Sequence, residues 1–168
     1  MGKFDGKFES GSQEWETPQW LFDVLNIGFN FSCDVAADED NTKCVKFMDE
    51  NLDALTQNWE GVCWMNPPYG QVGKWVKKAF NEFQKGGTTI VALIPARTNT
   101  IWWHDYCMGA SAIHFIKGRV KFSDAKHGLP QPLAIVIFDR MAIGRDTIYA
   151  TFDIKIKKKR LLDWKNKK

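Results

Sequence analysis

A loop of Asn66, Pro67, Pro68 and Tyr69 follows a short apolar run at positions 62–65. The two prolines fix their φ angles and lack amide donors, and the residue before a proline is held extended. The loop is therefore stiff. We predict that it binds a planar group with an amino nitrogen: the Asn66 side-chain oxygen and the Pro67 carbonyl accept the amino protons, and Tyr69 stacks on the ring. The competing interpretation is a rigid turn that closes a strand.

Two acceptors on one amino group favour a particular reaction. An aromatic amine is a poor nucleophile because its lone pair is delocalised into the ring. Acceptors that draw the amino group towards tetrahedral geometry localise this lone pair for attack on the methyl group of a sulfonium. Positioning and electrostatics would supply the acceleration, so the chemistry requires neither a metal ion nor a covalent enzyme intermediate.

The elements that must position this loop alternate between helices and strands. A helix is predicted to start at Thr17 and Pro18 and to end at Gly28, and further helices are predicted at 72–85 and 100–108. Strands are predicted at 29–33, 43–48, 62–65, 88–94, 112–116, 120–122, 133–138 and 147–156. This alternation predicts an α/β fold with a mostly parallel sheet, in which Asp34 and Asn66 follow strand ends and converge on one crevice.

Length and composition point to one soluble globular domain of 168 residues, 44% of them apolar. We predict a flexible lead at 1–13, one domain at 14–154 and a basic tail at 155–168. The tail holds eight Lys or Arg residues and one Asp, so it either binds a polyanion or is a solvated terminus. The polar N-terminus resembles no signal peptide and no apolar run is long enough for a membrane span, which predicts an intracellular protein.

The four cysteines include no CxxC pair, and the chain has three His residues. A structural zinc site or a disulfide framework is therefore not expected, and the thiols are predicted to be reduced and mostly buried.

Several short motifs stand in an order that a known family shares. Trp15-Glu16-Thr17-Pro18 precedes the first predicted strand, Phe31–Ala37 spans its end, and Asp53-Ala54-Leu55 lies upstream of the Asn66–Tyr69 loop. Pro95–Thr98 and Gly118–Phe122 follow later. Together these motifs resemble the phage-type DNA N-6-adenine methyltransferase family (Dam-like) over roughly residues 13 to 140. A glycine-rich cofactor turn is absent, because Asp34-Val35-Ala36-Ala37 stands in its place.

The resemblance implies a class I S-adenosylmethionine-dependent methyltransferase with a Rossmann-like fold, which methylates the N6 amino group of adenine in double-stranded DNA. Its catalytic loop would be Asn66, Pro67, Pro68 and Tyr69. S-adenosylmethionine is expected to contact Trp15, Thr17, Pro18, Asp34, Ala36, Asp53 and Asn66. By charge, Asp34 suits the methionine ammonium of this cofactor, although it could instead cap its own turn. The acceptor for the ribose hydroxyls is left open among Asp38, Glu39 and Asp49.

DNA contacts are predicted from residues that follow later strand ends. Arg97 and Thr98 are expected on the same edge as Asn66, and Arg119 and Lys121 follow a tight turn at Gly118. Surface salt bridges are the alternative for the two cations. The stretch 123–131 is a further candidate for target contact, whereas Trp102 and Trp103 are expected in the core.

Three alternatives stay open on the residues alone. Loops of the same type occur in methyltransferases that act on RNA guanine or protein glutamine, and a non-catalytic DNA-binding protein could keep the fold. Cytosine-N4 enzymes usually carry Ser in place of Asn66. The resemblance places the protein in the cytoplasm of a phage-infected bacterium. Neither the recognition sequence nor the oligomeric state can be read from the residues.

Overall fold

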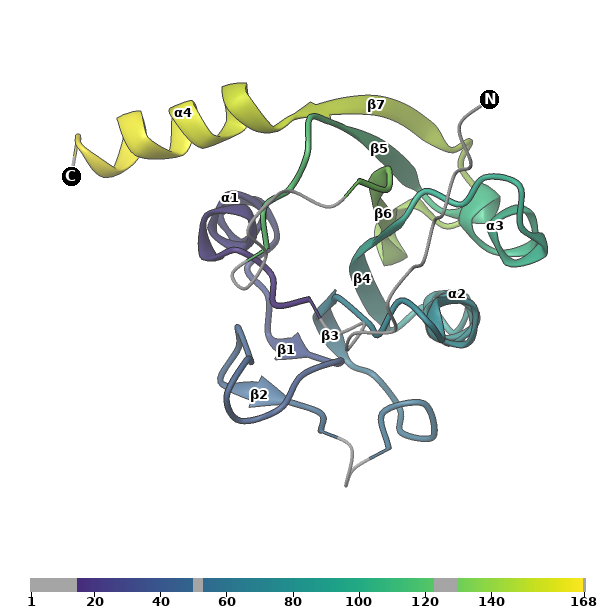
Figure 1. The fold of residues 1–168 in the computed structure, drawn as a ribbon. Helices are drawn as coiled ribbons and strands as arrows, with labels where there is room; N and C mark the ends of the chain where they lie inside the picture. Colours follow the sequence, from purple (N-terminus) through teal and green to yellow (C-terminus); the bar gives the residue numbers. More distant parts are fainter. Residues whose placement is uncertain (1–14, 50–52, 123–129, 168) are drawn as a thin grey trace, which may run out of the picture.

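The computed structural model describes residues 15–49, 53–122 and 130–167. The predicted lead at 1–13 and most of the candidate loop at 123–131 lie outside these ranges. Within them the chain forms a seven-stranded sheet in the order β2-β1-β3-β4-β6-β5-β7 (Figure 1). The strands are β1 (Cys33–Asp34), β2 (Lys46–Phe47), β3 (Gly61–Met65), β4 (Thr88–Pro95), β5 (Ala112–Lys117), β6 (Leu133–Phe138) and β7 (Ile148–Asp153).

The sheet is mostly parallel, as predicted. β2, β1, β3 and β4 run in one direction, with Cys63 opposite Ile90 in the β3–β4 pair. β6 is antiparallel to both β4 and β5, and β7 is parallel to β5. β6 is therefore the one reversed strand of this sheet. The carboxyl ends of the other six strands meet at a single edge.

Helices cover both faces of the sheet. α1 (Gln19–Phe29) packs on one face and α2 (Val72–Gln84) on the other, with α3 (Ile101–Asp105) beside α2 (Figure 1). β4 shows why both layers are needed, because all eight of its residues are buried. Its side chains alternate between the two layers: Ile90 and Ala92 pack on the α2 side, and Val91 and Leu93 on the α1 side.

Several boundary predictions were wrong: the strand predicted at 43–48 is Lys46–Phe47, the one predicted at 147–156 ends at Asp153, and α3 covers only Ile101–Asp105 of the helix predicted at 100–108. α1 begins at Gln19 without a side-chain cap from Thr17, and it ends at Asn30, whose φ of 52° is left-handed, rather than at Gly28. The predicted strand at 29–33 shrinks to Cys33–Asp34, because Phe29 completes the helix. The segment 120–122 is not a strand. Val120 and Phe122 are instead buried anchors of an irregular segment in the core.

The segment predicted as a basic tail contains a helix, α4 (Ile154–Lys165). It starts directly where β7 ends and extends beyond the body of the molecule beside α1 (Figure 1). Short 3-10 helices occur at Cys107–Gly109 and Arg140–Ala142. All four cysteines are free, and three of them are buried. No described helix combines the length and apolarity that a membrane crossing requires.

Candidate active site

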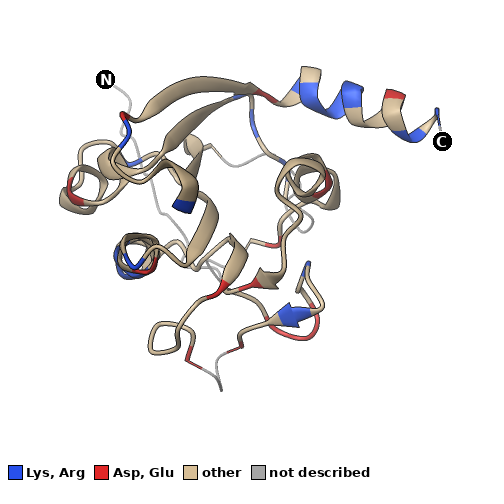
Figure 2. Cartoon of the chain, turned by 180° about the vertical axis from the view of Figure 1, so that it is seen from behind, with Lys and Arg blue, Asp and Glu red and all other residues tan. Residues whose placement is uncertain are grey.

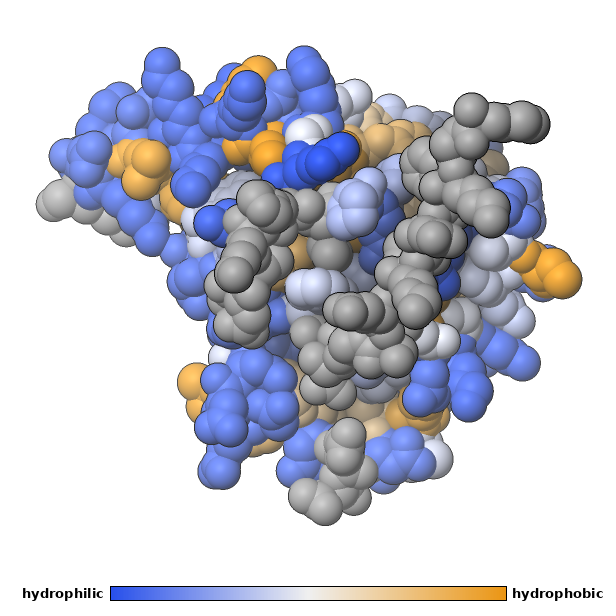
Figure 3. Space-filling view, viewed as in Figure 1, coloured by the Kyte–Doolittle hydropathy of each residue, from blue (hydrophilic) through white to orange (hydrophobic). Residues whose placement is uncertain are grey.

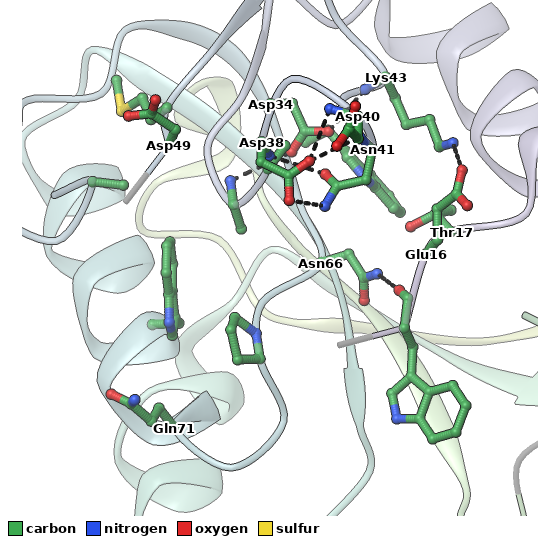
Figure 4. Close-up of a pocket in the computed structure, with 18 of the residues that line it drawn as sticks. Glu16, Thr17, Asp34, Asp38, Asp40, Asn41, Lys43, Asp49, Asn66 and Gln71 are labelled. Carbon is green, nitrogen blue, oxygen red and sulfur yellow. Dashed lines mark hydrogen bonds and ion pairs between the residues drawn. The ribbon is translucent and has the colours of Figure 1, made fainter. Parts of the chain in front are cut away.

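A cavity of ≈ 840 Å³ opens at the edge where the parallel strands end. It gathers most of the residues that were predicted from separate parts of the chain. Its lining includes Trp15, Thr17, Asp34, Ala36, Asp53, Asn66 and Pro68. Figure 4 labels Thr17, Asp34 and Asn66 among them. Pro18 is buried at the start of α1 and does not line the cavity. β1 and β3 are neighbours in the sheet, and this pairing brings Asp34 and Asn66 to the same crevice.

The Asn66 side chain is oriented by one hydrogen bond and leaves one atom free. Its Nδ2 donates to the carbonyl of Trp15, in the segment that precedes α1 (Figure 4). Its Oδ1 is buried and accepts no hydrogen bond from any described residue. Such an atom costs about 1–3 kcal/mol when it is left without a donor. An acceptor held at the wall of a cavity is an arrangement suited to an amino group brought in from outside.

Tyr69 differs from its expected position. It is 2% exposed, packs in the α1-side core and does not line the cavity. Burial raises the pKa of its hydroxyl, and this hydroxyl has no partner among the described residues. Pro67 is also buried, while Pro68 reaches the cavity wall. In this conformation the loop presents Asn66 and Pro68 to the cavity, but not the tyrosine ring.

Asp34 caps its own turn, and it also lines the cavity. Its carboxylate accepts backbone hydrogen bonds from Lys43, at 3.1 Å, and from Ala36, at 3.4 Å, so it organises the turn after β1. It also lines the cavity, with only 3% of its surface exposed. Burial raises the pKa of Asp34 to about 6, against the opposing effect of the two backbone donors. A cation brought beside this carboxylate would stabilise its charged form.

An ion pair between Glu16 and Lys43 closes one side of the cavity and was not anticipated. The Lys43 Nζ lies 2.7 Å from Glu16 Oε1, and the lysine side chain is 9% exposed (Figure 4). Both residues line the cavity, next to Thr17 and Asp34. Twenty-seven positions separate the two partners in the sequence, so no local pattern signals the pair.

The candidate acceptors for ribose hydroxyls separate in space. Asp38 and Asp49 line the cavity, and Glu39 does not. Both oxygens of Asp38 are engaged within its own loop, by the backbone amides of Asp40 and Asn41 and by the Asn41 side chain. Asp53 lines the cavity from a turn in which its φ is 41°. The sequence motifs did not single out Trp64, Gln71 or Trp75, which also line the cavity.

The predicted DNA-contacting residues lie outside the cavity, on the same edge of the sheet. Arg97 and Thr98 follow the end of β4, Arg119 and Lys121 follow the end of β5, and all four are exposed. His104 Nε2 lies 2.9 Å from the Thr98 carbonyl oxygen and ties that loop to α3. The described residues contain no group of three or more His, Cys, Asp or Glu side chains placed to hold a metal ion.

The sheet order, the single reversed strand and a polar cavity at the carboxyl edge define a Rossmann-like methyltransferase fold. The model of the DNA N-6-adenine-methyltransferase (Dam) family matches residues 7–152, so the chain belongs to this family. The prediction of an adenine-specific DNA methyltransferase is confirmed at that level.

Two curated phage proteins are similar to this chain, and both are named DNA N-6-adenine-methyltransferase. The one from Haemophilus phage HP1 (strain HP1c1) is 30% identical over 144 residues, which cover 80% of this chain and 83% of the relative. The one from Escherichia phage T1 is 30% identical over 106 residues, which cover 61% of this chain and 44% of that longer relative.

Proposed function

We propose that the protein transfers a methyl group from S-adenosylmethionine to the N6 amino group of adenine in double-stranded DNA. The observation that carries the proposal is that Asn66 lines the strand-end cavity and that its buried Oδ1 has no described partner. An exocyclic amino group supplies the donor that this atom lacks. The Pro67 carbonyl is proposed as the second acceptor, so that the pair localises the nitrogen lone pair.

The lining of the cavity suits S-adenosylmethionine, which would supply the electrophilic methyl group. Asp34 offers a buried carboxylate for the ammonium of the methionine part, beside Trp15, Thr17 and Ala36. Asp53 offers an acceptor for the adenine amino group of the cofactor. Asp38 and Asp49 both line the cavity and are the proposed acceptors for the ribose hydroxyls.

An adenine within a duplex is stacked, so its amino nitrogen reaches Asn66 only if the base is flipped out. Tyr69 is proposed to stack on the flipped base, which requires the ring to leave its buried position. The exposed side chains of Arg97, Thr98, Arg119 and Lys121 are proposed to contact the duplex around the cavity. We further propose residues 14–154 as the methyltransferase domain, acting in the cytoplasm of the bacterial host.

Replacement of Asn66 by Ala tests the proposed role directly. We expect N66A to lower transfer of labelled methyl to unmethylated duplex DNA by about 100-fold or more, which is the usual cost of removing one preorganised polar partner. The affinity for S-adenosylmethionine, measured by calorimetry, should stay within a few-fold. N81A is the matched control, because Asn81 is exposed on α2 far from the loop.

The same assay, run on DNA, RNA and protein in parallel, tests the substrate. Label in the N6 position of DNA adenine is the expected result. Label in RNA or protein but not in DNA would overturn the substrate assignment. Near-normal turnover by N66A would overturn the mechanism while leaving the substrate in place.

A further inference from the structure

The helix α4 carries a basic face that the cavity does not use. Lys155, Lys158 and Lys159 are exposed and fall at the i, i+3 and i+4 positions that share one side of a helix. None of the three makes an ion pair within the described ranges. Figure 2 shows Lys and Arg along most of the α4 ribbon. Across residues 155–168 the chain has eight basic residues and one acidic residue, whereas the rest is slightly acidic overall.

This helix is held in place rather than loosely attached. The side chain of Asp153 accepts from the backbone amides of Lys155, at 3.0 Å, and of Ile156, at 3.3 Å, which caps the first turn. Leu161 is 4% exposed and lies beside Val24 and Ile27 of α1. Near the other end, Lys165 Nζ lies 2.6 Å from Asp23 Oδ2 of α1. A fixed helix holds its charges at set positions, so they act together on a rigid polyanion.

The topology places the start of α4 at the edge that carries the active site. β7 is parallel to β5, so both strands end at the same edge of the sheet. α4 follows the end of β7 there, and the segment with Arg119 and Lys121 follows the end of β5. The turn at Gly118 and the first turn of α4 are in close contact, because a Cβ added at Gly118 would lie 2.7 Å from Ile154 Cδ1. The Lys158 Nζ lies 5.5 Å from the centre of the Trp20 ring, at the start of α1 and three residues after Thr17. The start of α4 thus lies with Arg119 and Lys121 at the edge of the sheet where the cavity also opens.

The exposed apolar side chains of α4 do not form a continuous stripe. Ile156, Leu162 and Trp164 are each about half exposed, and basic residues stand between them. Figure 3 shows the same arrangement, with hydrophilic atoms over most of the helix and isolated apolar ones among them. A partner helix or a lipid surface would select a broad apolar face. Charge complementarity instead favours a polyanion with regularly spaced phosphates.

We infer that the Lys155–Lys158–Lys159 face of α4 binds phosphates of the DNA duplex flanking the target adenine. The inference rests on the proposed function for the identity of the polyanion. A helix of this length spans about 18 Å, the span of several base pairs, so α4 reaches phosphates beyond the flipped base. Phosphate contacts raise the affinity and fix the position of the protein on the duplex, but they do not distinguish one DNA sequence from another.

The test is the salt dependence of binding to a short fluorescein-labelled duplex of mixed sequence, followed by anisotropy. K155Q/K158Q/K159Q removes three charges and keeps good helix formers, so α4 should remain folded by circular dichroism. We expect the slope of log affinity against log salt to fall by about 2 to 3, with at least about tenfold weaker binding near physiological salt. K46Q/K77Q/R145Q is the matched control, because it removes three exposed charges on β2, on α2 and before β7.

Methyl-transfer kinetics localise the contact. The triple lysine variant should raise the KM for a duplex that extends past the target on both sides. On a duplex cut close to the target, this difference from the wild type should shrink, because the flanking phosphates are gone. The affinity for S-adenosylmethionine should not change.

Two outcomes would overturn the inference: an unchanged salt slope in the lysine variant, or a change in oligomeric state with unchanged duplex binding, which would make α4 an interface between copies of the chain. The proposed function fails in a different way. In that case the wild-type protein transfers no methyl group to DNA, whatever its duplex affinity.

Discussion

Asn66 and Tyr69 supply the two buried side-chain atoms that lack a partner within the described chain, and both stand in one four-residue loop. Buried polar atoms are nearly always hydrogen-bonded, so a pair of exceptions in one loop calls for a cause. For Asn66 we propose that the missing partner is the amino group of the substrate. For Tyr69 we propose that the ring moves onto the flipped base, which would also bring its hydroxyl out of the core.

The raised pKa of Asp34 leads to a prediction about the pH dependence of stability and of cofactor binding. Burial raises its pKa to about 6 from 3.8, so folding favours the protonated form. This stabilising contribution is complete below pH 3.8 and is lost as the pH rises through about 6. At neutral pH Asp34 is charged, and this lowers the free energy of unfolding of the cofactor-free protein by about 3 kcal/mol. A cofactor ammonium beside Asp34 offsets this cost.

We therefore expect the affinity for S-adenosylmethionine to fall as the pH drops below about 6, by up to about tenfold per unit. Calorimetry from pH 5 to pH 8 measures it. D34N should bind weakly and without this pH dependence. An identical pH profile in D34N and the wild type would remove Asp34 from the cofactor site.

At the scale of elements, the turn between β5 and the Arg119 segment depends on Gly118. Its φ is 109°, and an added Cβ would lie 2.7 Å from Ile154 in the first turn of α4. We expect G118A to lower the free energy of unfolding by about 1–3 kcal/mol, because it forces a side chain into a backbone region that favours glycine. Urea unfolding measures the change.

Gly28 provides the opposite control, since it lies inside α1 and an added Cβ would meet nothing within 4 Å. G28A should stabilise the protein by about 0.4–1 kcal/mol. Equal destabilisation by both substitutions would mean that neither the strained φ nor the contact with Ile154 determines the effect.

The elements that the sequence predicted well are those with one dominant physical signal. The unbroken apolar run of β4 and the helical spacing of α2 are strong patterns, and both were found within a residue or two. The strand predicted at 120–122 was wrong. Val120 and Phe122 are two buried side chains of an irregular segment, and they produce the same alternation of apolar and polar residues as a half-buried strand. α4 was missed because Leu161 is its one buried residue, so it lacks an apolar stripe.

The candidate site was predictable as far as strand ends and short motifs define it. Asp34 and Asn66 converge because parallel neighbours end at one edge. The Glu16–Lys43 pair and the lining by Trp75 depend on tertiary contacts between distant segments, and no spacing in the chain encodes them. The burial of Tyr69 follows from packing against α1, which the loop motif by itself does not reveal.

On the scale of the whole molecule, the two charge types are separated. The cavity is lined by Glu16, Asp34, Asp38, Asp40, Asp49 and Asp53, and Lys43 is the one basic residue among its described lining residues. The rim carries Arg97, Arg119, Lys121 and the basic face of α4, and these are exposed. An acidic cavity repels the phosphate backbone and suits a cofactor with a net positive charge. Under the proposed function these exposed cations would attract the backbone, so that the duplex passes the cavity and only a flipped base enters it.

This separation predicts that salt affects the two ligands differently. Contacts to phosphates from six exposed cations release counterions, so duplex affinity should fall on the order of 10³-fold between about 50 and 200 mM salt. S-adenosylmethionine meets a carboxylate that is 3% exposed, where mobile ions screen little, so its affinity should change less than about threefold over the same range. Anisotropy and calorimetry on one preparation compare the two directly. A cofactor affinity that falls as steeply as duplex affinity would mean that the cofactor is held by surface charge, not by the buried carboxylate of Asp34.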